Sequence, residues 1–295
     1  MSSAESHIIQ EQLKVKLVET EMNKIHNVDC LEFMDKLIEE GVIVDAIICD
    51  PPYGTTACKW DSIIPFDEMW LRLNKLIKPN GAIVLFGSEP FSSFLRVSNI
   101  KNFKYDWIWE KQKAANFMGS KYSPLKYHET ISVFSNSKHE YYPQKYKVLE
   151  LDEVLSMNSK TLKNCIETKD IDRFGKIDRR KTVNDCIDPK DSHYGKMKNK
   201  VRNADSGYRN PKSILKINKS INNNVHPTQK PVELMEYLIK TYTNENELVL
   251  DFTTGSGTTG VACKNLNRNF YGCELDKDYA SIANKRLESV QGSLF

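Results

Sequence analysis

The chain has 295 residues, enough for one large domain or for a core domain that carries an insertion. Hydrophobic residues make up 40% of the sequence and charged residues 27%, a globular composition that excludes a disordered or collagen-like chain. The net charge is only +3, and neither a signal peptide nor a run of about 18 apolar residues is present, so we predict a cytoplasmic protein without a membrane span.

The cysteines give no sign of a structural cross-link. There are seven of them, scattered along the chain and never spaced as C-x-x-C. This pattern predicts neither a disulfide framework nor a zinc site, and we expect no bound metal.

The first 135 residues begin with a polar N-terminal extension, 1–23, in which we assign no function. From residue 24 short apolar strands alternate with amphipathic helices. We predict strands at 24–28, 45–49, 82–86, 105–110 and 129–134, and helices at 31–39, 66–77 and 91–99. The turn sequence Pro79-Asn80-Gly81 is expected to close the second of these helices.

The middle of the chain, residues 136–225, lacks this regularity and differs in charge. It carries 20 Lys or Arg against 12 Asp or Glu, whereas the segments on either side are slightly acidic. Regularity returns with predicted helices at 231–242, 258–266 and 277–290, and strands at 248–251 and 270–274. We therefore predict a doubly wound α/β fold with a mainly parallel sheet, in which segments 24–135 and 226–295 form two halves and 136–225 is an inserted basic domain.

A glycine-rich turn, Thr254 to Gly260, follows the apolar strand that ends at Asp251 and opens a helix. Glycines there let the backbone turn tightly, while free N–H groups at the helix start face a ligand. Glu274 ends the next strand, where a carboxylate can accept hydrogen bonds from both hydroxyls of a ribose. The pattern predicts a nucleoside cofactor, and a nicotinamide dinucleotide fits the same glycine spacing.

The sequence Asp50-Pro51-Pro52-Tyr53 follows the apolar strand at 45–49. The prolines fix the backbone, and this places the Asp50 carboxylate and the Pro51 carbonyl as two acceptors for an exocyclic amino group of a planar base. The base would stack on the ring of Tyr53. Holding both hydrogens in this way directs the nitrogen lone pair at an electrophilic methyl group, so the tetrapeptide indicates amino-group methylation without a covalent nucleophile.

These two motifs together resemble the amino-group DNA methyltransferases that use S-adenosylmethionine. The (D/N/S)PPY motif is matched by Asp50 to Tyr53, and a FxGxG-type loop is matched in part by Gly255 and Gly257. The motif order, with the catalytic motif before the insertion and the cofactor half after it, is that of the β-class. The resemblance implies a Rossmann-like methyltransferase fold whose insertion recognises the target sequence.

The resemblance also assigns cofactor contacts beyond the glycine loop. Asp29-Cys30 would lie near the adenine of the cofactor, Thr228 and Lys230 near its methionine end, and Asp251 near its amino group. Where many relatives read Asp-Pro-Phe, this chain reads Asp251-Phe252-Thr253. The full predicted set is Asp29, Cys30, Asp50, Thr228, Lys230, Asp251, Phe252, Thr253, Gly255, Gly257, Thr258, Thr259, Glu274 and Leu275.

The DPPY form of the motif resembles adenine-N6 enzymes more than cytosine-N4 enzymes, which more often begin with Ser. We therefore predict adenine-N6 methylation, with cytosine-N4 methylation as the alternative and RNA or protein-amide methylation as a more distant one. Methylation of cytosine C5 is disfavoured because that chemistry needs a cysteine after proline, and the chain contains no Pro-Cys pair.

The resemblance implies double-stranded DNA as the partner, and residues 173–219, which carry 14 Lys or Arg against 5 Asp, are suited to contact its phosphates. We expect Arg179, Arg180 and Lys181 to contact phosphates. Base edges would be read by Arg202, Arg209 and Asn210. The resemblance leaves a cognate restriction endonuclease and a homodimer open as further partners.

Overall fold

The computed structural model describes residues 20–55, 61–114, 116, 119–147, 208–218 and 229–290. Contacts divide the chain into two units: unit 1 contains residues 1–142 and 213–295, and unit 2 contains residues 143–212. The boundaries of the inserted domain expected at 136–225 stay a prediction.

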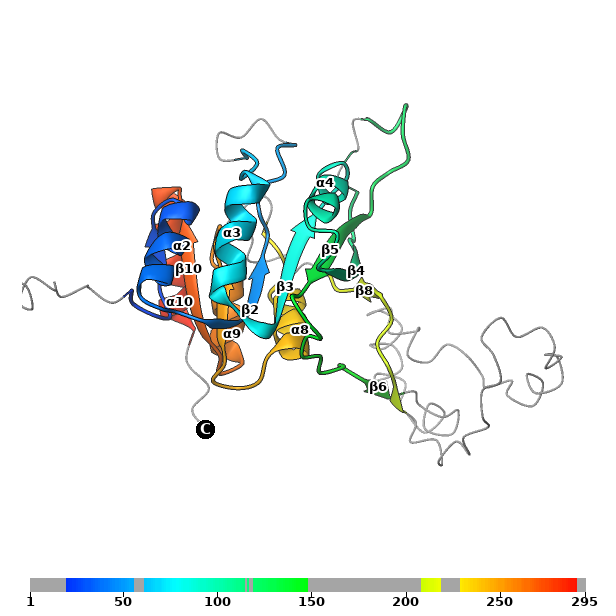
Figure 1. Cartoon of the computed structure of the whole chain (residues 1–295). Coiled ribbons are helices and arrows are strands. Elements are labelled where there is room, and N and C mark those ends of the chain that lie inside the picture. Colours follow the sequence, from blue (N-terminus) through cyan, green and yellow to red (C-terminus); the bar gives the residue numbers. More distant parts are fainter. Residues whose placement is uncertain are drawn as a thin grey trace, which may run out of the picture. The chain divides into compact units, whose positions relative to one another are not determined.

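Unit 1 is built on an eight-stranded sheet whose strands lie in the order β1-β10-β9-β2-β3-β5-β4-β8 (Figure 1). β5 runs antiparallel to its neighbours β3 and β4, and every other pairing is parallel. β2 and β9 are adjacent, so the two halves of the chain meet at the centre of one sheet. The strands are β1 Ile25–Asn27, β2 Val44–Cys49, β3 Ile77–Gly87, β4 Phe103–Glu110, β5 His128–Phe134, β8 Ile214–Lys216, β9 Leu248–Asp251 and β10 Asn269–Glu274.

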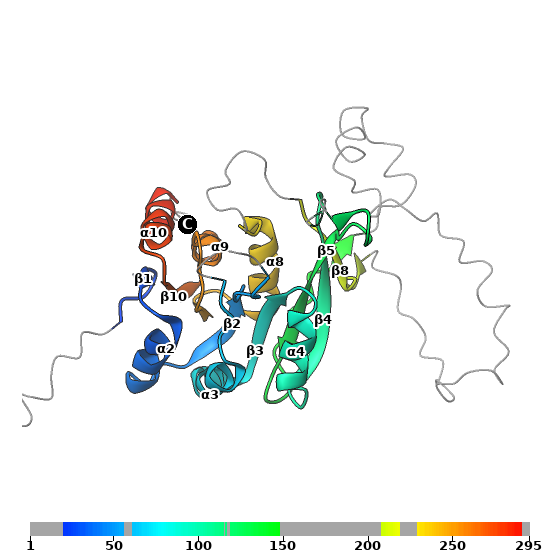
Figure 2. The same cartoon turned by 90° about the horizontal axis from the view of Figure 1, so that it is seen from above.

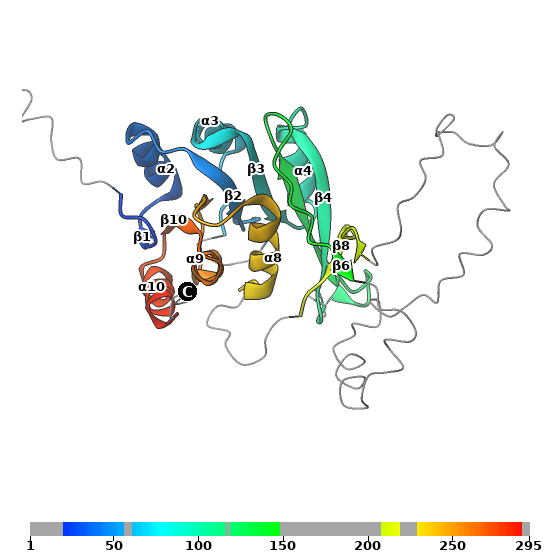
Figure 3. The same ribbon diagram turned by 90° about the horizontal axis from the view of Figure 1, so that it is seen from below.

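Helices cover both faces of this sheet (Figures 2 and 3). One face carries α2 (Cys30–Glu39), α3 (Phe66–Leu76) and α4 (Phe91–Ser98). The opposite face carries α8 (Val232–Tyr242), α9 (Thr258–Asn265) and α10 (Lys277–Ser289). The doubly wound arrangement expected from the sequence is confirmed. Across the described ranges, no helix is long and apolar enough to cross a membrane.

The two helical layers create two apolar cores, one on each face of the sheet. Strand β2 serves both of them, because alternate side chains of a strand point to opposite faces. Ala46 and Ile48 pack in the core beneath α8, α9 and α10, whereas Ile47 and Cys49 pack in the core beneath α2, α3 and α4. All four side chains are fully buried, as expected of a central parallel strand covered on both sides.

The predicted elements of unit 1 are confirmed, with ends that shift by a few residues, but one turn lies elsewhere than expected. Pro79-Asn80-Gly81 does not close a helix, because α3 already ends at Leu76 and the three residues lie inside β3. They bulge out of the ladder between the pairs Val44–Ile77 and Ala46–Ala82. The physical reason is that Pro79 has no N–H to contribute to the ladder.

Strand β8 was not predicted. It has only three residues, and its pairing with β4 joins residues more than a hundred positions apart in the sequence. In unit 2, β6 (Tyr146–Lys147) and β7 (Tyr208–Arg209) form a two-stranded antiparallel sheet. Arg209 lies in β7 and Asn210 follows it, whereas four of the predicted DNA contacts lie outside the described residues: Arg179, Arg180, Lys181 and Arg202.

Two glycines of the turn between β9 and α9, Gly255 and Gly257, have positive φ angles but differ in the space available for a side chain. Gly257 has a φ of +78°, and an added Cβ would lie 2.8 Å from Cβ of Ala283. Gly255 has a φ of +53°, but no atom lies within 4 Å of its added Cβ. We expect Gly257→Ala to lower the free energy of unfolding by about 2–5 kcal/mol, because backbone strain and overpacking combine.

The matched control is Gly255→Ala, for which backbone strain alone predicts a loss of about 1–2 kcal/mol. Urea unfolding of both variants measures the difference. Equal losses would show that the contact with Ala283 does not limit this position.

Candidate active site

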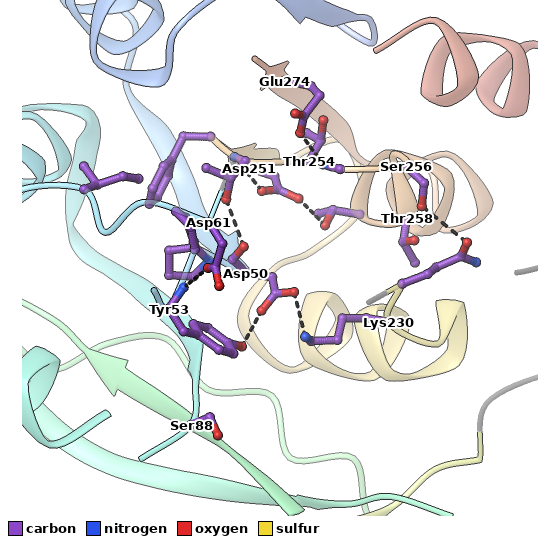
Figure 4. Close-up of a pocket in the computed structure, with 18 of the residues that line it drawn as sticks. Asp50, Tyr53, Asp61, Ser88, Lys230, Asp251, Thr254, Ser256, Thr258 and Glu274 are labelled. Carbon is purple, nitrogen blue, oxygen red and sulfur yellow. Dashed lines mark hydrogen bonds and ion pairs between the residues drawn. The ribbon is translucent and has the colours of Figure 1, made fainter. Parts of the chain in front are cut away.

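A cavity of about 920 Å³ opens at the carboxyl ends of β2, β9 and β10. From β2 the chain crosses through α3 to β3, and from β9 it crosses through α9 to β10 on the other side. Where crossovers diverge in this way, a crevice forms between the strand ends, and ligands of open α/β sheets bind there. Asp50, Asp251 and Glu274, which follow or end these strands, all line the cavity (Figure 4).

Most of the predicted site residues reach this cavity. It is lined by the predicted residues Asp29, Cys30, Asp50, Pro51, Pro52, Tyr53, Lys230, Asp251, Phe252, Thr253, Gly255, Thr258, Thr259, Glu274 and Leu275. Gly257 is not part of the lining, because its α-carbon faces Ala283 of α10. Thr228 lies outside the described residues.

The Asp50 carboxylate is held from both sides (Figure 4). The Tyr53 hydroxyl donates a hydrogen bond to Oδ1, and the Lys230 ammonium donates to Oδ2 at 2.6 Å. Burial raises the pKa of Asp50, and the positive charge of Lys230 opposes this shift. Each carboxylate oxygen has two lone pairs, so the group retains acceptor positions toward the cavity.

The backbone after Asp50 is fixed by a carboxylate that sequence reasoning missed. Asp61 Oδ1 accepts the backbone N–H groups of Tyr53 at 2.8 Å and Gly54 at 2.9 Å, and Oδ2 accepts that of Thr55 at 2.9 Å. The Tyr53 ring lies against Phe91, with 5.2 Å between the ring centroids. These contacts make the Pro-Pro-Tyr segment rigid. No motif marks Asp61, because its role depends on how the loop folds back.

Glu129 is a second charged group that the sequence did not single out for the site. It lies near the start of β5 and is held between two lysines: its Oε1 is 3.0 Å from Lys111 Nζ and its Oε2 is 3.0 Å from Lys230 Nζ. Although burial by itself raises the pKa of Glu129, the charges of Lys230 and Lys111 lower it overall. A charged residue at the beginning of an otherwise buried apolar strand was the available signal.

At the other end of the cavity, Glu274 braces the glycine-rich turn. Its Oε2 accepts the N–H of Gly255 at 2.8 Å, and its Oε1 accepts the N–H of Asp276 at 2.9 Å. Burial raises the pKa of Glu274. One lone pair remains on each oxygen, so this carboxylate can accept hydrogen bonds from two neighbouring hydroxyls.

The residues at the end of β9 connect the two ends of the cavity. Thr253 Oγ1 donates to the carbonyl oxygen of Asp50 at 3.0 Å and lies 2.9 Å from Sγ of Cys49. Phe252 is fully buried in the core beneath α2, α3 and α4.

At the start of α2, Asp29 Oδ1 caps the helix by accepting the N–H of Leu31 at 2.8 Å.

Asp251 is almost completely buried at the end of β9. Its Oδ2 accepts the Thr259 hydroxyl at 2.5 Å, and its Oδ1 accepts the N–H of Thr253 at 3.2 Å. Burial raises the pKa of Asp251 to about 6, against the lowering effect of these hydrogen bonds. An anionic Asp251 is therefore suited to receive an ammonium group, and it loses this ability in mild acid.

This pKa leads to a prediction about cofactor affinity. If Asp251 binds the amino group of S-adenosylmethionine, the bound ammonium lowers the pKa of Asp251. The affinity must then fall as the pH drops through about 6, approaching a tenfold loss per pH unit. Calorimetry at a series of pH values measures this slope, and Asp251→Asn should remove it. An affinity independent of pH in the folded wild-type protein would contradict the assignment.

Comparisons with known proteins all find DNA methyltransferases. The profile of the DNA methylase family, N6/N4 type, matches residues 44–285. Type II methyltransferase M1.MboII of Moraxella bovis is 31% identical over 285 residues, which cover 92% of this chain and 98% of the relative. Type II methyltransferase M.HpaI of Haemophilus parainfluenzae is 32% identical, over 86% of this chain and 71% of the relative.

Solved structures show the same similarity. The M1.HpyAVI–SAM complex has a TM-score of 0.56 at 26% identity and covers 89% of this chain and 98% of its own. The cytosine-N4-specific PvuII DNA methyltransferase has a TM-score of 0.55 at 15% identity, over 94% and 92% of the two chains. At that identity the second likeness concerns the fold alone.

Proposed function

Because the chain belongs to the family of N6-adenine and N4-cytosine DNA methylases, we propose that it methylates adenine N6 in a specific sequence of double-stranded DNA. Membership makes it an S-adenosylmethionine-dependent DNA methyltransferase. The observation that carries the choice of chemistry is the Asp50 carboxylate, held rigidly beside the Pro-Pro-Tyr segment at the edge of the cavity.

The cavity fits S-adenosylmethionine through the residues of its cofactor half. Glu274 offers two acceptor positions for ribose hydroxyls, Asp251 offers a carboxylate for the amino group, and the space where a side chain of residue 255 would lie is open. When bound, the cofactor supplies an electrophilic methyl group. These roles of single residues are part of the proposal.

The other half of the cavity would receive the target base. The Asp50 carboxylate and the Pro51 carbonyl accept the two N–H bonds of the amino group, so its lone pair points at the methyl group. Tyr53 offers the face of its ring to the base, and its hydroxyl keeps Asp50 in place. A flipped-out base costs a few kcal/mol of stacking, which contacts to the DNA backbone must offset.

The DNA contacts are proposed for the basic segment of the chain. Of the predicted set, Arg209 and Asn210 lie at and after β7 in unit 2. We propose adenine and not cytosine as the target base because the DPPY form of the motif resembles that of adenine-N6 enzymes. A cognate endonuclease and a homodimer stay predictions from the family resemblance.

The test is transfer of labelled methyl groups from S-adenosylmethionine to unmodified genomic DNA, followed by mass spectrometry of the nucleosides. We expect N6-methyladenine, and sequencing of the modified sites would then give the recognition sequence. N4-methylcytosine would assign the alternative base. An RNA control without product separates DNA from RNA methylation, and no DNA product with S-adenosylmethionine bound would refute the proposal.

A further inference from the structure

Four charged side chains form an alternating row behind the catalytic motif. Asp50, Lys230, Glu129 and Lys111 follow one another at 2.6, 3.0 and 3.0 Å, and they come from four separate places in the chain. The Lys230 side chain is 8% exposed and that of Glu129 is 14% exposed. Buried charges are costly unless each has a partner, so a change to one member of the row alters the electrostatic environment of the others.

Lys230 is the shared member of this row. Its ammonium lies between two carboxylates, at 2.6 Å from Asp50 Oδ2 and at 3.0 Å from Glu129 Oε2. Its ammonium also lies 5.1 Å from the centroid of the Phe86 ring, which limits where it can move. An ammonium with Asp50 as its one anionic partner would neutralise that carboxylate more completely than an ammonium shared by two.

We propose that Glu129 is a positioning residue for methyl transfer, which draws the Lys230 ammonium partly away from Asp50 and so keeps the Asp50 carboxylate a strong acceptor for the target amino group. The inference rests on the proposed function of Asp50. It adds a residue from β5, outside both motifs, that acts on the reaction through Lys230.

Lys230 and Glu129 have opposite effects on the pKa of Asp50. After burial, which raises the pKa of Asp50, the two largest influences are Lys230, which lowers it, and Glu129, which raises it. The other titratable groups that face Asp50 are Tyr53, Cys49 and Asp251. Tyr53, which donates to Asp50, and Cys49 stay neutral because burial raises the pKa of each. Asp251, with a pKa of about 6, also titrates, but it is unchanged in every variant compared. Removing Glu129 or removing Lys230 must therefore shift the titration of Asp50 in opposite directions.

The experiment measures single-turnover methyl transfer to DNA across the pH range for wild type, Glu129→Gln and Lys230→Met. In Glu129→Gln we expect a rate about tenfold lower on the plateau, because the acceptor is weaker. The acid limb of the profile should move to lower pH by about one unit. In Lys230→Met the acid limb should move to higher pH, so that raising the pH restores part of the rate.

Two further variants separate positioning from folding. Glu129→Asp keeps the charge and should keep the wild-type position of the acid limb, even if its rate is lower. Glu68→Gln removes an exposed carboxylate that pairs with Arg72 on α3, and it should change neither rate nor profile. S-adenosylmethionine affinity of Glu129→Gln should stay within about threefold of wild type.

Acid limbs that coincide in all variants, or that move in the same direction in Glu129→Gln and Lys230→Met, would overturn the inference. If Glu129→Gln does not fold, the comparison of Lys230→Met with Glu129→Asp tests the inference. Only Lys230→Met should shift the acid limb of the pH–rate profile. Absence of product from the wild-type enzyme would instead mean that the proposed function fails.

Discussion

Replacing Asp50 by alanine should reduce methyl transfer by about 10³-fold or more while S-adenosylmethionine affinity stays within about threefold of wild type. The carboxylate is bound by Tyr53 and Lys230 at the base half of the cavity, whereas the acceptors proposed for the cofactor lie at β9 and β10. The loss should therefore fall on the chemical step. Single-turnover transfer measures the rate, and calorimetry measures cofactor binding.

A matched control for Asp50→Ala is Asp35→Asn, which removes a half-exposed carboxylate that pairs with Arg72 on the outside of α2. This variant should transfer methyl groups at the wild-type rate. Loss of transfer and of cofactor binding together in Asp50→Ala, in a protein that still unfolds cooperatively, would contradict the separation of the two halves of the site.

The second large effect is expected at the opposite end of the cavity. Glu274→Ala should weaken S-adenosylmethionine binding by about 100-fold, because the variant cannot make the two charge-assisted hydrogen bonds that we propose between Glu274 and the ribose. The same change frees the N–H of Gly255, which Glu274 accepts at 2.8 Å, so the glycine-rich turn also loses its brace. At saturating cofactor, the rate of transfer should recover most of its wild-type value.

Asp278→Ala is the control for this experiment, since it removes another acidic side chain, in the first turn of α10, that does not line the cavity. Its affinity for S-adenosylmethionine should be unchanged. Wild-type affinity in Glu274→Ala would show that the ribose is held elsewhere, and the Asp29 carboxylate at the start of α2 would be the next position to test.

Sequence patterns predicted the sheet and its helices because each element carries its own signal. The run at 45–49 is apolar at every position after Asp45, and the structure buries these four apolar residues in two cores. β8 carries no such signal, since three residues acquire strand geometry only by pairing with β4. The bulge at Pro79 was missed for a related reason: a turn sequence also fits a break inside a strand.

The residues of the site likewise fall into those that the sequence predicted and those that it missed. Motif residues such as Asp50 and Gly255 stand directly after strands, and the structure brings them to one cavity. Asp61 and Glu129 reach it through a loop that folds back and through the antiparallel strand β5, which no spacing in the sequence indicates. Lys230 was expected near the methionine end of the cofactor, and its described partners are Asp50 and Glu129.

Hydrogen bonds within unit 1 fix the chain immediately before and immediately after residues 143–212. Just before this segment, the N–H of Tyr142 donates to the carbonyl of Thr241, and just after it the carbonyl of Ser213 accepts from Ile108. Both bonds lie within the scaffold of unit 1. A different segment spliced between these two anchors would leave the sheet, the glycine-rich turn and the Pro-Pro-Tyr segment intact. Under the proposal that this basic segment recognises the target, specificity would change by exchange of one contiguous stretch of gene.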